Sequence, residues 1–119
     1  MKRDMNLIRE ILIKLEEHEN PNVWLSIEIE NEDPVKVSYH IKLLSEARML
    51  EGKDLGIDQY FCWKARSLTY QGHELLDSMR DGTVFKRVKN HFGEKFNSVP
   101  LEVIKQMALK FTLESLGIK

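Results

Sequence analysis

Three features of the sequence predict an α+β fold, mainly helical, with a winged-helix-like core. Apolar residues recur at helical spacing within the first 20 residues. A second helical pattern, from Pro34, is followed by two short strand-like runs, and two more helical patterns occupy residues 83–119. The expected order in residues 1–82 is helix, strand, recognition-type helix, two-stranded wing and helix. Residues 83–119 add two C-terminal helices packed on the same domain.

Length and composition are those of a small soluble domain. The chain has 119 residues, enough for one core, with 42% hydrophobic and 31% charged residues. No run approaches the roughly 18 apolar residues that a membrane span needs. The single cysteine, Cys62, excludes an internal disulfide, and no export signal is recognisable. We therefore expect a cytoplasmic protein.

The first helix is expected to follow Asp4, whose carboxylate suits an N-cap. Asn20 and Pro21 end it. Ile13 lies off the apolar stripe, so it is expected to contact a later helix or a second subunit. The stripe consists of Leu7, Ile8, Ile11, Leu12 and Leu15.

Residues 23–30 alternate between apolar and polar side chains over their second half, a pattern typical of a half-buried strand. The residues expected to face inward are Leu25, Ile27 and Ile29. Asp33 then suits the N-cap of the next helix. A complete helix-turn-helix has one more helix before this point. That helix is either lost or reduced to a turn around Asn31.

The helix from Pro34 to about Met49 is the candidate DNA-recognition helix. Its apolar face consists of Val37, Ile41, Leu44 and Ala47. The side chains predicted to point the other way, toward base edges or phosphates in a major groove, include Ser38, Tyr39 and Lys42. The alternative is a solvated face that contains one lysine and one tyrosine.

A two-stranded ribbon is expected next, with strands at residues 49–53 and 60–66. Lys53, Lys64 and Arg66 would place three cations around it and are the candidate phosphate contacts. The alternative is that these side chains are simply solvated. Cys62, on the second strand, is interpreted as a small buried hydrophobic residue rather than a reactive thiol.

The helix that opens with Thr69 as N-cap contains Gly72 in its first turn, which predicts a close backbone contact there. His73 and Asp77 flank Glu74 at a spacing that superficially resembles a zinc motif, but no third ligand is present. The sequence also lacks a phosphate-binding glycine loop and a serine elbow. We therefore expect no enzymatic activity, and we infer no metal, cofactor or small-molecule substrate.

The two C-terminal helices are expected to begin at a Thr83 cap and near Pro100. Their apolar stripes contain Val84, Phe85, Val88, Phe92 and Phe96, and Leu101, Ile104, Met107, Ala108 and Phe111. Leu113 and Leu116 lie off the second stripe. These helices either pack entirely within the monomer or also form a homodimer through an antiparallel helix pair. The candidate dimer residues are Ile13, Leu113 and Leu116.

The charge is unevenly distributed. Residues 1–82 hold 11 Lys and Arg against 16 Asp and Glu, a balance of −5, whereas residues 83–119 hold 7 against 3, a balance of +4. Seven acidic residues and no Lys or Arg lie from Glu16 to Asp33. A DNA-binding face needs local positive charge, because counterion release supplies much of the affinity. The half of the chain that resembles a DNA-binding scaffold is therefore the acidic half.

Three segments carry a resemblance to a known family. They are the opening Met-Lys-Arg-Asp-Met-Asn-Leu-Ile-Arg, the helix segment Ser38-Tyr39-His40-Ile41-Lys42-Leu43-Leu44, and Leu68-Thr69-Tyr70-Gln71-Gly72-His73-Glu74. Together they resemble domain-of-unknown-function family 2513, small bacterial proteins often found in phage and prophage sequences. The resemblance covers nearly the whole chain and implies a winged-helix-like fold and a prophage origin. It brings no established activity or catalytic residues.

Two functional hypotheses remain. The first is a winged-helix DNA-binding protein, a phage or prophage regulator that contacts duplex DNA. The second is a protein–protein interaction module that keeps the scaffold but engages a protein partner through its acidic face or its C-terminal helices. The absence of a complete helix-turn-helix and the seven acidic residues weigh against the first hypothesis.

Overall fold

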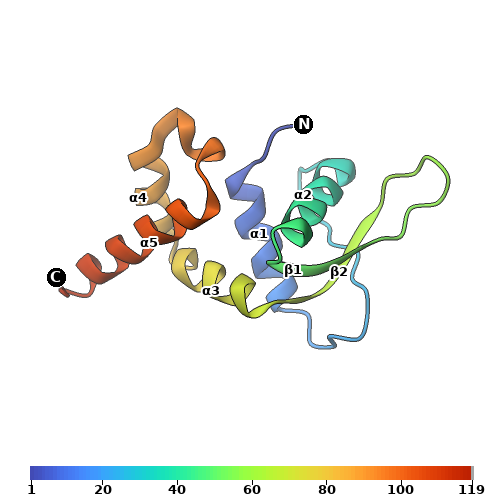
Figure 1. The fold of residues 1–119 in the computed structure, drawn as a ribbon, viewed down its shortest axis with the longest axis horizontal. Helices are drawn as coiled ribbons and strands as arrows, with labels where there is room; N and C mark the ends of the chain where they lie inside the picture. Colours follow the sequence, from blue (N-terminus) through green and yellow to red (C-terminus); the bar gives the residue numbers. More distant parts are fainter. Residues whose placement is uncertain (119) are drawn as a thin grey trace.

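The computed structural model describes residues 1–118 as an elongated α+β domain, 52 × 31 × 23 Å, in which the ribbon loop and the end of the last helix lie at opposite ends (Figure 1). The helices and strands in chain order are α1 (Met5–Glu16), α2 (Pro34–Glu46), β1 (Leu50–Asp54), β2 (Trp63–Leu68), α3 (Tyr70–Met79), α4 (Gly82–Phe92), the 3₁₀ helix η1 (Gly93–Ser98) and α5 (Leu101–Ser115).

The small sheet has the topology expected of a winged helix. β1 and β2 pair antiparallel, with Lys53 opposite Lys64 and Gly52 opposite Ala65. Ala65 also forms an isolated antiparallel bridge with Leu25, through backbone hydrogen bonds of 2.7 and 3.2 Å. β2 therefore lies between β1 and the segment that contains Leu25. The mainly helical, winged-helix-like fold class predicted from the sequence is confirmed.

The strand predicted over residues 23–30 is not formed as a strand. Only Leu25 makes a bridge, although Ile27 and Ile29 are buried as expected. An extended chain lying against a core shows the same alternation as a strand, so the pattern identifies burial but not pairing. Within the described residues no helix lies between α1 and α2, and Asn31 occupies a turn with a φ of 65°. The first helix of a helix-turn-helix is thus reduced to this turn.

Three predicted helix caps are confirmed. Asp4 accepts hydrogen bonds from the backbone N–H groups of Asn6 and Leu7, Asp33 from Val35, and Thr69 from Gly72; these are the orphan donors that an N-cap satisfies. The predicted Thr83 cap is wrong. Asp81 caps α4 instead, and its carboxylate accepts from the N–H groups of residues 83 and 84. Asp81 and Thr83 are both residue types that favour an N-cap, and the two-residue shift is within the usual uncertainty of predicted helix ends.

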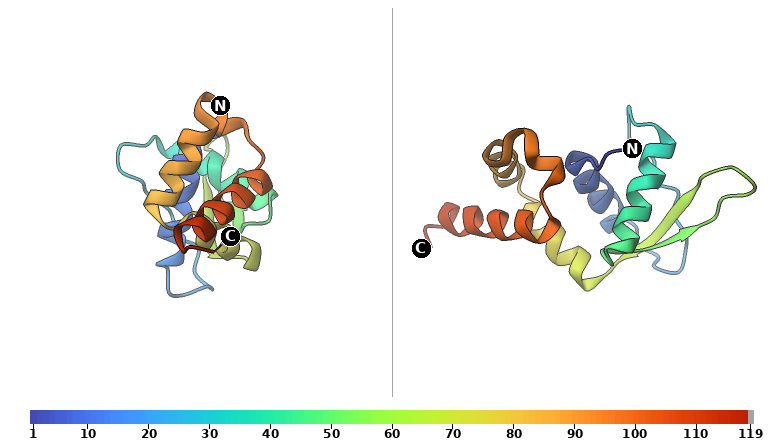
Figure 2. Two further views of the ribbon diagram at one scale, coloured as in Figure 1. Left: turned by 90° about the vertical axis from the view of Figure 1, so that its left-hand side faces the viewer. Right: turned by 45° about the horizontal axis from the view of Figure 1, so that its top comes forward.

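One continuous core joins the helices and the ribbon. α1 crosses the centre and contacts α2, α3 and β2, whereas α5 packs on α3 and α4 (Figures 1 and 2). The fully buried large side chains are Met5, Leu7, Ile8, Ile11, Leu12, Leu15, Ile41, Leu44, Leu75, Leu76, Met79 and Ile104. Six of these twelve come from α1, so this helix is the main apolar element of the fold.

Hydrogen bonds attach the start of α1 to both halves of the chain. The N–H of Asp4 donates to His40 Nε2 on α2 at 2.8 Å, and the N–H of Met5 donates to Asn97 Oδ1 in η1 at 2.9 Å. Arg3 donates to the carbonyl of Val99. The C-terminal helices are therefore tied to the winged-helix core by polar contacts as well as by apolar packing.

Two arginines fasten the end of α3 to α1. Arg9 donates to the carbonyl oxygens of Met79 (2.8 Å) and Arg80 (2.6 Å), which are orphan acceptors at a helix C-terminus. Arg80 in turn donates to both carboxylate oxygens of Glu16, at 2.5 and 2.6 Å. The hydrogen bond from Arg80 lowers the pKa of Glu16 below its ordinary value. Because both side chains are exposed to solvent, this pair contributes modestly to stability.

Candidate nucleic-acid interface

The outer face of the ribbon carries a cluster of cations, formed by Lys53, Lys64 and Arg66. Lys64 and Arg66 alternate along β2 with the fully buried Ala65, so they share the face that points away from the core. Lys53 is the direct partner of Lys64 across the strands. Neither lysine forms an ion pair within residues 1–118, whereas Arg66 donates to Glu51 at 2.6 Å. The three predicted ribbon cations therefore do lie together on one surface.

Trp24 is the fourth member of this surface, and sequence reasoning missed it. The Arg66 guanidinium lies 4.8 Å from the centroid of its ring, and the Lys53 ammonium lies 5.9 Å from it. Both distances fall within the range of cation–π attraction. Trp24 precedes the bridging Leu25, so it belongs to the opposite face of the extended segment. The alternation that turns Trp24 away from the core could be read from the sequence, but the pairing of this segment with β2 could not.

The predicted recognition helix is less available than expected. Ser38 is buried, and its hydroxyl accepts a hydrogen bond from the N–H of Trp63 at 3.2 Å. The prediction that Ser38 faces outward is therefore wrong, because β2 packs over that side of α2. Tyr39 and Lys42 are partly exposed. They lie on α2, which packs on the ribbon from the side opposite the cation cluster, so the six predicted residues do not form one continuous surface.

The tip of the wing is apolar and acidic. Ile57 is 75% exposed and Tyr60 is 69% exposed. The loop between the strands includes Asp58 and follows Asp54, and it contains no Lys or Arg. Such a tip repels phosphate, so a phosphate contact made by the wing would have to come from the body of the ribbon. Cys62, in the same loop, is free and partly buried.

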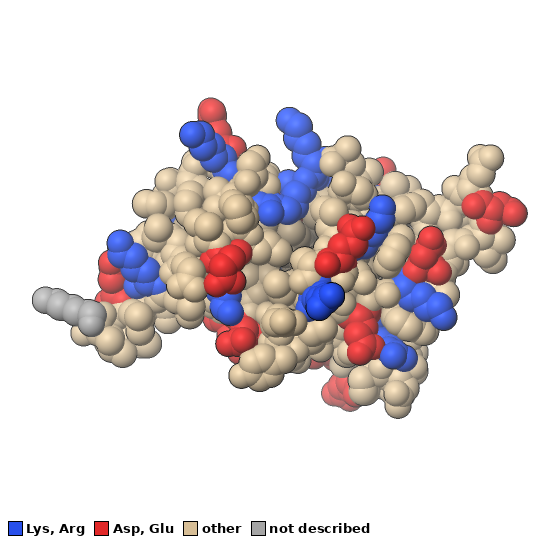
Figure 3. All heavy atoms as spheres, viewed as in Figure 1, with Lys and Arg blue, Asp and Glu red and all other residues tan. Residues whose placement is uncertain are grey.

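Elsewhere the charges are interspersed. On the face shown in Figure 3, lysines and arginines alternate with carboxylates, and no broad area of one sign is visible. Several basic side chains are neutralised by neighbours: Arg87 donates to Glu114 at 2.6 Å, and Lys36 lies 3.0 Å from Asp4. Burial alone would raise the pKa of Asp4, but the hydrogen bonds from Lys36 and from Leu7 outweigh it and hold that pKa below its ordinary value.

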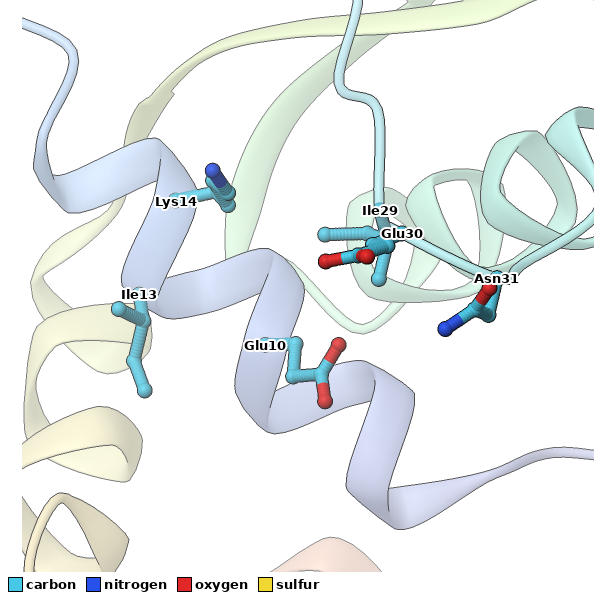
Figure 4. A pocket seen from close by; sticks show the side chains of 6 residues that line it. All are labelled: Glu10, Ile13, Lys14, Ile29, Glu30 and Asn31. Carbon is cyan, nitrogen blue, oxygen red and sulfur yellow. The ribbon is translucent and has the colours of Figure 1, made fainter.

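A second surface feature is an acidic groove between α1 and residues 29–31, with a volume of about 390 Å³. Figure 4 shows Glu10 projecting from α1 toward this segment and the Glu30 carboxylate projecting back toward α1. The lining residues are Glu10, Ile13, Lys14, Ile29, Glu30 and Asn31. Ile13 is thus half-buried against the core and this groove, whereas Leu113 and Leu116 are exposed on α5 and its C-cap.

The described residues contain no cluster of three or more His, Cys, Asp or Glu side chains placed to bind a metal ion. In the same part of the chain, every helix is too short or too polar to cross a membrane. The fold and its polar surfaces together define a winged-helix-like α+β domain with a cationic ribbon.

The chain belongs to the DUF2513 family, described as a hypothetical protein, whose model matches residues 2–98. This match confirms the family resemblance found in the sequence. The chain is also 41% identical over 109 residues to an uncharacterized protein of Haemophilus influenzae, and the alignment covers 91% of this chain and 92% of that protein. No solved structure matches the chain.

Proposed function

We propose that this protein is a winged-helix DNA-binding protein that contacts the phosphates of duplex DNA through the outer face of its ribbon. The observation that carries the proposal is the position of Lys53 directly opposite Lys64, with Arg66 beside them. Like charges directly opposite on neighbouring strands destabilise a sheet. A bound phosphate would relieve this repulsion and gain two charge-assisted hydrogen bonds.

The remaining residues have separate roles in this proposal. Glu51 and Trp24 hold the Arg66 guanidinium in a fixed orientation beside the lysines. Tyr39 and Lys42 lie on α2, on the other side of the ribbon, and take no part in this contact. Because the helix that normally fixes the reader in the groove is reduced to a turn, we infer that phosphate contacts contribute more than base contacts. A regulator of phage or prophage origin is the biological setting that the family resemblance suggests, and the single cysteine favours the cytoplasm.

Replacing both opposed lysines should separate binding from stability. We expect Lys53→Gln/Lys64→Gln to weaken binding to a fluorescent duplex about tenfold in roughly 50 mM salt, and to reduce the slope of log K against log salt by about 2. The free energy of unfolding should stay the same or rise slightly, because the cross-strand repulsion is removed. Fluorescence anisotropy and urea titration measure the two quantities.

The matched control is Lys86→Gln/Lys89→Gln, which removes the same charge from the exposed surface of α4. It should leave affinity nearly unchanged. Equal losses in both double variants would show that only net charge matters and would contradict a ribbon site. Absence of duplex binding by the unmodified protein even at low salt would contradict the proposal as a whole.

A second candidate function is that of a protein–protein interaction module without DNA binding. The acidic groove favours it: Glu10 and Glu30 face each other across the groove, and neither forms an ion pair within residues 1–118, although Lys14 also lines the groove. A basic segment of a partner protein would supply the missing counter-charge. The salt titration above distinguishes the two functions, since this one requires no affinity for duplex DNA.

A further inference from the structure

Helix α5 carries two apolar stripes, and only one of them is covered. Ile104, Ala108 and Phe111 are buried, on the side of α5 that packs against α3 and α4. The second stripe consists of Leu109, Leu113 and Leu116, which are 39%, 45% and 68% exposed. Their spacing of four and then three residues repeats along one side of a helix, as in the seam of a helix pair.

A groove lies beside the exposed stripe, with a volume of about 520 Å³. Its lining residues are Gln106, Leu109, Lys110, Leu113, Glu114 and Ile118. Ile118 folds back over the helix end, because its N–H donates to the carbonyl of Leu113 at 2.8 Å and Gly117 adopts a φ of 75°. The same short segment therefore presents both protruding leucine side chains and a groove that could receive such side chains.

We propose that two copies of this chain pair through α5, antiparallel, about a two-fold axis near Thr112. In this arrangement Leu113 of one copy meets Leu113 of the second copy, and Leu109 meets Leu116 of the second copy at each end. With the axis between positions 112 and 113, Lys110 and Glu114 of the second copy lie within one residue of directly opposite positions, so Lys110 approaches Glu114, twice by symmetry. The pairing does not depend on DNA binding.

Charge and area both favour a second copy as the partner. Lys110 has no carboxylate partner within residues 1–118. Glu114 already accepts from Arg87 through Oε2 at 2.6 Å, so a lysine of a second copy would bind its other carboxylate oxygen, Oε1. The exposed side chains of the stripe and Ile118 present on the order of 400 Å² per copy, the size of an apolar patch that marks an interaction site. With flanking polar side chains from both copies, the contact approaches the roughly 1,200 Å² of a specific interface.

Ile13 is not part of this surface. It is half-buried beside the core and lines the groove between α1 and residues 29–31. Of the three residues named from the sequence as a dimer interface, the proposal therefore retains Leu113 and Leu116 and adds Leu109.

Sedimentation velocity over a concentration series tests the pairing. The 14.0 kDa chain should shift toward twice that mass as its concentration rises. Leu113→Asp should raise the dimer dissociation constant at least about tenfold, because it buries an unpaired charge at the two-fold axis. Val103→Asp is the matched control: Val103 is 44% exposed on the same helix but lies away from the seam, so dimerisation should persist.

A charge exchange gives a second, more specific readout. Lys110→Glu places two carboxylates opposite each other in its own dimer, and Glu114→Lys places two ammonium groups opposite each other. Each variant alone should dimerise several-fold more weakly than the unmodified chain. An equimolar mixture should instead form a heterodimer, because both cross-subunit pairs are then oppositely charged.

A chain that stays at the monomer mass at roughly 500 µM, near the upper end of dissociation constants for weak specific contacts, overturns the proposal. So does a Val103→Asp variant that weakens association as much as Leu113→Asp does. A mixture of Lys110→Glu and Glu114→Lys that associates no better than either variant alone excludes the antiparallel register. Heterodimer formation in the mixture supports it.

Discussion

Gly72→Ala is expected to cause the largest loss of stability among the substitutions proposed for this protein. A Cβ at position 72 would overlap the carbonyl oxygen of Met49 and lie 2.9 Å from its carbonyl carbon. These are backbone atoms, and they are held in place: the carbonyl of Met49 accepts the N–H of Thr69 at 3.1 Å, and the carbonyl of Arg48 accepts the Thr69 hydroxyl at 2.6 Å. α3 would have to move away from the start of the ribbon.

We expect Gly72→Ala to lower the free energy of unfolding by about 3 kcal/mol or more, a large part of the stability of a domain this size. Urea denaturation followed by circular dichroism measures it. Gly82→Ala is the control, since the nearest atom to its Cβ would be an Arg9 guanidinium nitrogen at 3.9 Å. There alanine should stabilise the helix by up to about 1 kcal/mol. Similar effects of the two substitutions would refute the close contact.

His40→Leu is expected to have the second largest effect. His40 is fully buried, and both of its ring nitrogens are used. Nε2 accepts the N–H of Asp4 at 2.8 Å, and Nδ1 donates to the carbonyl of Lys36 at 2.8 Å. Leucine has a similar volume but leaves the Asp4 donor without its partner. A buried donor left without an acceptor costs more free energy than a formed hydrogen bond contributes. We therefore expect the free energy of unfolding to fall by about 2–4 kcal/mol.

His40→Gln should lose less, since a glutamine oxygen can still accept the N–H of Asp4. Leucine at His73, which is exposed on α3, should have little effect. Thermal unfolding of His40→Leu, His40→Gln and His73→Leu ranks the three variants by stability. If His40→Leu is as stable as His73→Leu, the link between α1 and α2 through this ring is not a source of stability.

The helices and their caps could be predicted from the sequence because they depend on neighbours along the chain. Asp4, Asp33 and Thr69 cap their helices as predicted, and the stripe of α1 forms the centre of the core. Gly72 was correctly associated with a close backbone contact, since a glycine in the first turn of a helix has a cost that packing must justify. In these cases the local signal and the fold agree.

The candidate site was harder to predict because it depends on pairing between distant segments. Lys53, Lys64 and Arg66 were placed around one ribbon correctly, since they lie on two strands joined by a short loop, but the register, with its irregularity beside Arg66, could not be read from the sequence. Trp24 joins them only because Leu25 bridges Ala65, 40 positions away, which no local pattern reveals. The prediction that Ser38 faces outward failed for the same reason. It lies beside the apolar face of α2, and the ribbon covers that edge.

The reduced entry helix changes how such a scaffold would meet nucleic acid. In a complete helix-turn-helix, the first helix crosses the DNA backbone and orients the second. Here an extended segment replaces it, and that segment instead contributes Trp24 to the outer face of the ribbon. The wing tip, with Ile57 and Asp58, does not favour phosphate. We infer that binding relies on the body of the ribbon.

The most direct test of the proposed contact between the ribbon and DNA is a ¹⁵N NMR titration of the protein with a short duplex at low salt. We expect shifts of the Trp24 indole N–H and of amides near Lys53, Lys64 and Arg66, reversed at high salt because the contacts are with phosphates. Absence of shifts on the ribbon, or shifts confined to α4 and α5, would contradict the ribbon as the nucleic-acid contact.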